Sequence, residues 1–169
     1  TLQGGGIGLI DLALFAAFRL YDLLPAQAAF VLLLAINGLG VLLALRQDAL
    51  PLAVLAFAGG FLAPVLTSTG EGSHVALFSY YLLLNLAIFG IALFRAWRPL
   101  NLAGFIFTFG IGTTWGVLRY RPENFATTEP FLIAFFLLYV AIPVVYALRH
   151  RLRGWVISAM ATVLMSWMA

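Results

Sequence analysis

Few side chains in this sequence could do chemistry, and their types already limit what that chemistry can be. The chain has two His and six acidic residues, all nine of its basic residues are Arg, and it has no Cys. Without Cys or Lys it has no thiolate nucleophile, no thiolate metal ligand and no amine for a Schiff base. Two His argue against a histidine-rich metal centre. We therefore expect neither a metal ion nor another cofactor.

Most of the titratable side chains gather around two expected connections between apolar segments. They are Glu71, His74, Arg119, Arg121, Glu123 and Glu129. Two carboxylates and a His could perform general acid–base catalysis if the fold brings them together. The alternative is that these carboxylates only neutralise nearby Arg side chains or, as at Glu129, favour the N-terminus of a helix.

Two stripes of polar and aromatic side chains recur at helical spacing. The first is His74, Phe78, Tyr81 and Asn85, and the second is Asn101, Phe105, Thr108, Gly112, Trp115 and Arg119. Facing stripes of this kind could line a substrate path or a sugar-sized pocket. The alternative is that Asn and Thr hydrogen-bond between helices while the aromatic rings lie at the membrane interface. A short connection at 95–99 predicts an antiparallel hairpin in which Asn85 lies level with Thr108 and hydrogen-bonds there.

Two further candidate sites lie inside apolar segments. A carboxylate at the depth of Asp11 is costly in a membrane and marks a functional site by default, although it could also pair with a buried donor near a helix end. At Gly59, Gly60 and Pro64, two residues without a Cβ precede a proline that removes a hydrogen bond to the Gly60 carbonyl. This pattern predicts a broken helix of the kind that lines transporter cavities. The alternative is a simple kink that packs against a neighbouring helix.

The elements that must position these residues are long and apolar. Hydrophobic residues make up 64% of the 169 residues, charged residues make up 9%, and the mean hydropathy is +1.07. A soluble domain carries about 25% charged residues, so a soluble enzyme and a nucleic-acid-binding domain are excluded. A helix needs about 20 apolar residues to cross a bilayer. The sequence predicts an all-α, polytopic transmembrane helix bundle of about seven spans, near residues 4–21, 26–45, 50–66, 75–94, 100–118, 130–148 and 154–169.

The arginines set the expected orientation of this bundle. The breaks after the second, fourth and sixth spans hold six Arg and one acidic residue, whereas the alternate connections hold three Arg and four acidic residues. We therefore expect Arg46, Arg95 and Arg151 to face the cytoplasm, and Glu71 and Glu123 to face outside. The expected location is the bacterial cytoplasmic (inner) membrane.

Five stretches taken together resemble a known family. They are residues 59–66 (GGFLAPVL), 74–81 (HVALFSYY), 98–101 (RPLN), 107–113 (FTFGIGT) and 120–131, which contains YRPE and TTEPF. From Gly4 to about Arg149 the chain resembles the bacterial predicted-membrane-protein family catalogued as domain of unknown function 2339. The resemblance implies a longer polytopic protein, of which residues 1–169 would form a single transmembrane helical region. It brings no established reaction, cofactor or catalytic residue.

Three functions stay open at this point. The first is a transport path or the handling of an envelope substrate, based on Asp11, the Gly59–Pro64 segment and the two stripes. The second is a membrane-embedded transferase or hydrolase with an outward-facing site around Glu71, His74 and Glu123. The third is a non-catalytic scaffold that binds other membrane subunits or the remainder of a longer chain. Membrane lipids are expected partners in each case, and nucleic acid in none.

Overall fold

The computed structural model describes the backbone of residues 2–68 and 73–167 and the side chains of residues 4–68 and 73–148. Within these residues every regular element is a helix. The helices are α1 (Leu2–Arg19), α2 (Ala26–Gln47), α3 (Leu50–Leu66), α4 (His74–Phe94), α5 (Arg98–Arg119), the short 3₁₀ helix η1 (Pro122–Asn124) and α6 (Phe125–Trp167). The predicted all-α class is confirmed.

Several of these helices are long and apolar enough to cross a membrane. By length and composition α2, α4, α5 and the segment Pro122–Leu148 qualify, and α3 is a shorter apolar helix. The predicted second to fifth spans agree with α2 to α5 to within a few residues at each end. The structure therefore supports a membrane helix bundle but does not support seven separate spans.

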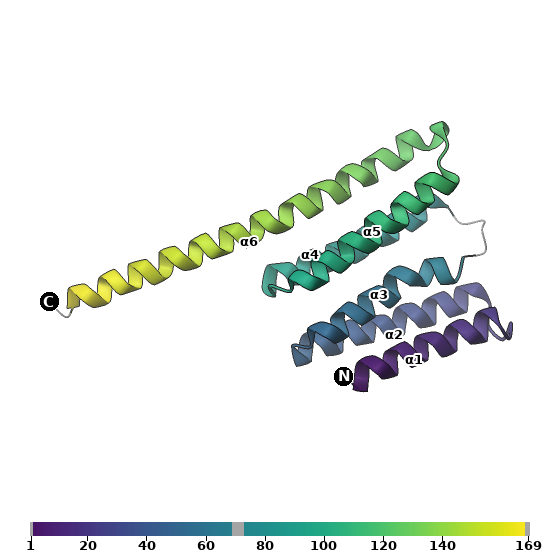
Figure 1. The fold of residues 1–169 in the computed structure, drawn as a ribbon, viewed down its shortest axis with the longest axis horizontal. Coiled ribbons are helices and arrows are strands. Elements are labelled where there is room, and N and C mark those ends of the chain that lie inside the picture. The colour runs from purple at the N-terminus through teal and green to yellow at the C-terminus, as the bar shows by residue number, and fades with distance from the viewer. Residues whose placement is uncertain (1, 69–72, 168–169) are drawn as a thin grey trace.

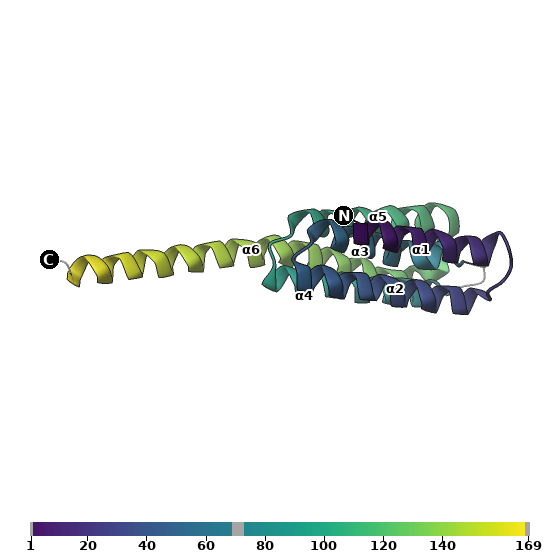
Figure 2. The ribbon, with the colours of Figure 1, turned by 90° about the horizontal axis from the view of Figure 1, so that it is seen from below.

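The predicted break between the sixth and seventh spans does not form. We expected the basic run at 149–153 to separate two helices, but α6 continues as a single helix of 43 residues. Arg and Leu favour helix, and this run contains no Pro or Gly that would end it. A helix of this length measures about 65 Å, whereas the hydrocarbon layer is only about 30 Å thick. α6 accordingly extends far beyond the other helices (Figure 2).

The helices lie side by side and alternate in direction (Figure 1). α1, α2 and α3 form one half of the bundle and α4, α5 and α6 form the other, and α3 joins the halves through its contacts with α4 and α5. The turns α2–α3 and α4–α5 lie at one end, and the connections α1–α2 and α5–α6 lie at the other (Figure 1). The antiparallel hairpin predicted for the fourth and fifth spans is confirmed.

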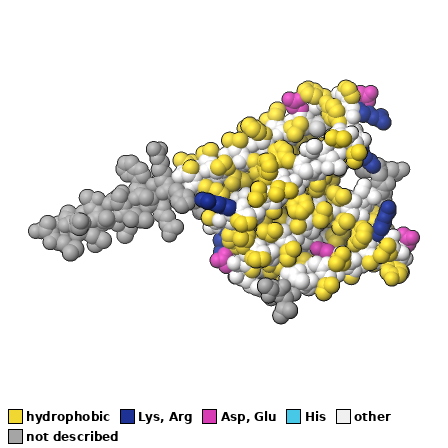
Figure 3. Space-filling model, in the orientation of Figure 1, with side chains coloured by type: hydrophobic (Ala, Val, Ile, Leu, Met, Phe, Trp, Pro, Cys, Tyr) yellow, Lys and Arg dark blue, Asp and Glu magenta, His cyan; other side chains and the backbone are white. Residues whose placement is uncertain are grey.

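Charged side chains lie mainly toward the two ends of the bundle, with hydrophobic side chains between them (Figure 3). At one end Arg95 forms an ion pair with Asp48 and donates from Nη2 to the Leu45 carbonyl at 3.4 Å, which ties the α4–α5 turn to the α2–α3 turn. Asp48 ends α2 with a left-handed φ of 54°, a conformation that Asp tolerates. Exposed Glu123 lies in η1 at the opposite end. Glu71 lies outside the described residues.

Small residues let α1, α2 and α3 approach one another closely. A Cβ on Gly40 of α2 would lie 2.7 Å from Ile7 Cδ1 and 2.9 Å from Ala56 Cβ. Such distances leave no room for a side chain, so the absence of a Cβ at Gly40 lets α2 contact α1 and α3 at one level. Close approach at small residues is a common way for helices to pack in membranes, where lipid is as apolar as the side chains.

Candidate functional site

A cleft of about 800 Å³ opens between α3, α4 and α5, close to the start of α4. Four of the predicted site residues line it: Pro64, His74, Trp115 and Arg119. They come from three different helices and from separate sequence patterns, so the fold brings together residues that the sequence could only propose one by one. Apolar side chains, including Phe30, Leu62, Leu77 and Ile111, form much of the remaining wall.

His74 at the mouth of this cleft is held by both an aromatic ring and a hydroxyl. Its ring centroid lies 5.3 Å from that of Trp115, and its Nε2 lies 2.8 Å from Thr127 Oγ1. The Thr127 hydroxyl donates its single hydrogen to the Asn124 carbonyl at 3.0 Å, so His74 Nε2 is the donor to Thr127. These contacts join the start of α4 to α5 and α6.

Below the cleft, the two predicted stripes meet in a buried hydrogen-bond network. Asn85 donates from Nδ2 to Thr108 Oγ1 at 2.7 Å and to the Tyr81 carbonyl at 2.8 Å, and Asn85 Oδ1 accepts from the Tyr139 hydroxyl. Asn85 is fully buried. The predicted pairing of Asn85 with Thr108 is confirmed. Every polar group of the Asn85 side chain has a protein partner, so the network joins α4, α5 and α6.

The broken helix predicted at Gly59–Pro64 is wrong, because α3 runs without interruption from Leu50 to Leu66. Pro64 has no N–H to donate to the Gly60 carbonyl. The Tyr80 hydroxyl of α4 donates to that carbonyl instead, at 2.7 Å, and the neighbouring Tyr81 hydroxyl donates to the Phe61 carbonyl at 3.1 Å. Donors from the next helix therefore replace the missing backbone bond, and α3 stays helical.

Asp11 lies apart from the cleft, where α1 meets α2 and α3. Asn37 of α2 donates from Nδ2 to Asp11 Oδ1 at 3.0 Å. Gly59 of α3 faces this pair, because a Cβ placed on it would lie 2.7 Å from Asp11 Oδ2 and closer still to Asn37 Oδ1. Gly59 thus belongs with Asp11, whereas its neighbours Gly60 and Pro64 belong with Tyr80 and the cleft.

Two members of the outward-facing acid–base set predicted from the sequence, His74 and Glu123, are described, whereas Glu71 lies outside the described residues. Glu123 is exposed and does not line the cleft that contains His74. The described part of the chain also contains no group of three or more His, Cys, Asp or Glu that could hold a metal ion.

Sequence reasoning missed three residues that the structure places in these sites: Asn37, Tyr80 and Tyr139. Asn37 is the one amide in the middle of α2, and a buried amide must find hydrogen-bond partners, so a signal was present. Tyr80 lies near the start of α4, where a Tyr usually marks the membrane interface, so nothing comparable distinguished it. Tyr139 lies in the middle of the predicted span 130–148, where a hydroxyl also needs a partner, so a signal was present there too.

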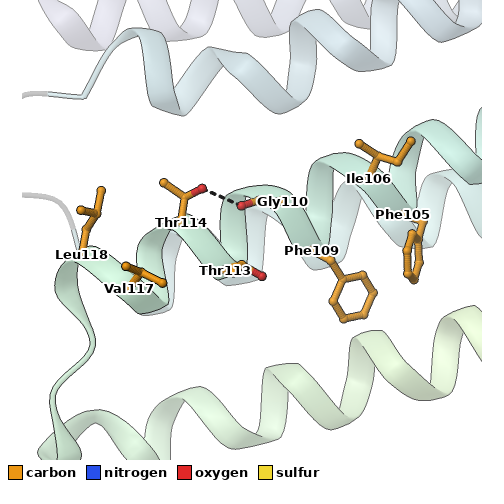
Figure 4. Close-up of a pocket in the computed structure, with 8 residues that line it drawn as sticks. All are labelled: Phe105, Ile106, Phe109, Gly110, Thr113, Thr114, Val117 and Leu118. Atoms are coloured by element: carbon orange, nitrogen blue, oxygen red, sulfur yellow. Dashed lines mark hydrogen bonds between the residues drawn. The ribbon is translucent and has the colours of Figure 1, made fainter.

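A second hollow, of about 630 Å³, runs along α5 (Figure 4). All eight residues that line it belong to α5, and the Thr114 hydroxyl donates to the Gly110 carbonyl of the same helix at 2.8 Å. Of the two predicted stripes it includes only Phe105. It is therefore a groove on the surface of one helix and does not join the candidate residues.

Comparison with known proteins gives one match. A family model described as "Predicted membrane protein (DUF2339)" matches residues 1–169, the whole of the sequence. No curated protein and no solved structure matches the chain.

Proposed function

The chain belongs to the DUF2339 family of predicted membrane proteins, and we propose that it handles an envelope lipid, an amphiphile with a phosphate-bearing head group. The proposed binding site is the cleft between α3, α4 and α5. The observation that carries the proposal is the make-up of the cleft wall, which combines a cationic and aromatic mouth with an apolar interior. A lipid is divided in the same way, into a charged head group that would meet the mouth and a hydrocarbon tail that would lie against the apolar interior.

The apolar part of the cleft suits a hydrocarbon chain. Leu77 and Ile111 lie one to two helical turns inward from His74 and Arg119, and Leu62 and Phe30 complete this part of the wall. A volume of about 800 Å³ falls within the range of about 300–1,000 Å³ common for ligand pockets. A lipid tail is already in apolar surroundings in the bilayer, so its entry into this wall adds little net free energy. The wall therefore accommodates the tail, and the polar mouth supplies the selectivity.

The polar mouth suits a phosphate. Arg119 lines the cleft at the last residue of α5, and a guanidinium presents paired donors that match phosphate oxygens. The His74 and Trp115 rings lie beside it, 5.3 Å apart between centroids, and their faces could stack on a sugar attached to the phosphate. Hydroxyls of Thr67, Ser73 and Thr114 add further hydrogen-bonding groups to the wall.

The proposal includes an orientation in the bacterial cytoplasmic (inner) membrane. The end with Arg46 and Arg95 faces the cytoplasm, because arginines are retained on that side during insertion. The cleft lies at the opposite end, with His74 and Arg119, so it faces outward. A lipid from the outer leaflet would enter it head group first along the membrane plane.

Native mass spectrometry of the purified chain in a neutral detergent tests this function. Phosphatidylglycerol should be retained in preference to phosphatidylcholine with the same acyl chains. Arg119→Gln should weaken phosphatidylglycerol binding about tenfold, which corresponds to about 1.4 kcal/mol and to the loss of one charge-assisted hydrogen bond.

Arg121→Gln is the matched control, since Arg121 is exposed, lies two residues away and does not line the cleft. It should leave the affinity unchanged. Equal losses in the two variants would mean that only the net charge of this end attracts the lipid. That result, or an unchanged Arg119→Gln variant, would overturn the proposed site.

A further inference from the structure

The Asp11–Asn37 pair contains one polar atom whose partner is missing. Asn37 is 2% exposed. Its Nδ2 has two hydrogens and uses both, donating to Asp11 Oδ1 at 3.0 Å and to the Leu33 carbonyl at 2.9 Å. Both partners accept hydrogen bonds, so turning the amide over would place its oxygen against two other oxygens, and the orientation is fixed. Asn37 Oδ1 is buried, and no donor among the described residues reaches it.

Asn37 Oδ1 and the second carboxylate oxygen of Asp11 both lie beside Gly59. A Cβ on Gly59 would meet Asn37 Oδ1 first and Asp11 Oδ2 at 2.7 Å, so both oxygens flank the same small space beside Gly59. That space exists because Gly59 has no side chain. Asn37 Oδ1 is buried there without a donor among the described residues, whereas Asp11 is only partly buried. An unpartnered buried polar atom is costly, since it loses its hydrogen bond to water and gains nothing in return.

We propose that Asp11 and Asn37 form a proton-binding site. A proton on Asp11 Oδ2 is donated to Asn37 Oδ1, while Asn37 Nδ2 continues to donate to Asp11 Oδ1, so acid and amide form a ring closed by two hydrogen bonds. In this form every polar atom of both side chains is satisfied and the pair is neutral. When the proton leaves, Asn37 Oδ1 loses its donor and a negative charge stays within the apolar layer of the bundle.

No charged group on the surrounding helices balances that negative charge. α3 has no titratable side chain, and the nearest charged groups on α1 and α2 in sequence are Arg19 and Arg46. They lie eight and nine residues from Asp11 and Asn37, which is about 12–14 Å along a helix. Asp22 and Asp48 lie farther along the chain, beyond the ends of these helices. The proton is therefore the one cation that this site needs.

A metal ion fits this site less well than a proton. Oxygen-bound ions such as Ca²⁺ and Mg²⁺ take six or more ligands, and transporters often supply them from unwound helices. Here α1, α2 and α3 are continuous helices, with no unwound segment beside the site to supply backbone carbonyls. The described side chains around the space beside Gly59 supply two oxygens, which is what one shared proton requires.

Infrared spectroscopy of the purified full chain, titrated over pH, tests the site. A protonated carboxyl group gives a C=O band separate from that of a carboxylate. We expect an acid band that is lost in Asp11→Asn and shifts in frequency in Asn37→Leu, because the acid then loses its amide partner. Labelling aspartate with ¹³C limits the assignment to Asp11, Asp22 and Asp48, the three Asp of the sequence, and needs no substitution.

Two glycine variants distinguish an effect on the Asp11–Asn37 pair from a general effect on α3. Gly59→Ala places a methyl group between the two oxygens and should shift or abolish the Asp11 band. Gly60→Ala meets its nearest atoms at 3.8 Å, an ordinary contact, and should leave the band unchanged. At neutral pH, where water-exposed carboxyl groups are ionised, an acid band that survives in Asp11→Asn would overturn the proposal. Labelled aspartates that titrate together in a single step would also overturn it.

Discussion

Replacing Asn85 with Leu removes the centre of the hydrogen-bond network between α4, α5 and α6. Asn85 is fully buried, and it bonds to Thr108 of α5 at 2.7 Å, to the Tyr139 hydroxyl of α6, and to the Tyr81 carbonyl of its own helix at 2.8 Å. Leu has nearly the same shape but neither donates nor accepts a hydrogen bond. Thr108 and Tyr139 would each lose their hydrogen bond to Asn85.

The expected loss of stability follows from the number of hydrogen bonds that Asn85 makes to other helices. A side-chain hydrogen bond between membrane helices contributes about 0.6 kcal/mol on average and at most about 1.7. Two of the three bonds cross between helices, so we expect the free energy of unfolding to fall by roughly 1–3 kcal/mol. The assay is unfolding of the purified chain in mixed micelles with a rising fraction of denaturing detergent, followed by circular dichroism.

Thr114→Ala is the matched control for this variant. Thr114 lies on an exposed face and donates only within α5, to the Gly110 carbonyl, so its loss should change stability by less than about 0.5 kcal/mol. Combining Asn85→Leu with Tyr139→Phe should cost less than the sum of the single variants, because both remove the same bond. Asn85→Leu with wild-type stability would refute the view that this network joins the three helices.

Three further predictions concern the backbone, the packing and the topology. Tyr80→Phe should destabilise the fold by about 1 kcal/mol, but by much less in a Pro64→Ala background, where the new N–H can reach the Gly60 carbonyl; detergent unfolding of the single and double variants measures the difference. Gly40→Leu should destabilise by about 1–3 kcal/mol because its side chain meets Ile7 and Ala56. Gly38→Ala, which has open space around it and introduces a better helix former, should not lower the thermal stability. Single Cys residues replacing Arg46 and Glu123 in this Cys-free chain should react with an impermeant maleimide from opposite sides of the membrane, and reaction from one side only would contradict the orientation.

The sequence predicted the helices and one contact well because both depend on local rules. Apolar runs of about 20 residues define α2 to α5, and a short turn forces α4 and α5 to lie antiparallel. Once two helices are antiparallel and start from a shared turn, their residues align by counting from the turn, which is why Asn85 and Thr108 could be paired in advance.

The contacts that the sequence did not predict depend on how neighbouring helices are rotated against one another. The donor that satisfies the Gly60 carbonyl comes from Tyr80, and the partner of Asp11 comes from Asn37 on the next helix. Hydrophobic periodicity does not fix these rotations in a membrane, because most faces of the helices are apolar. The continuity of α6 was missed for another reason: charge was taken as the end of a helix, although arginines are good helix formers.

The hydrogen bond from Tyr80 to the Gly60 carbonyl makes the substitutions that evolution tolerates at position 80 depend on the residue at position 64. A proline at 64 is harmless only while a hydroxyl stands at 80 to replace the N–H it lacks. Two routes lead away from this arrangement, and they are not equivalent: losing Pro64 first frees Tyr80 to vary, whereas losing Tyr80 first leaves a buried carbonyl without a donor. Selection should therefore tolerate the loss of Pro64 followed by the loss of Tyr80, and should act against the reverse order. We expect related sequences to keep both residues or to lose the proline before the tyrosine.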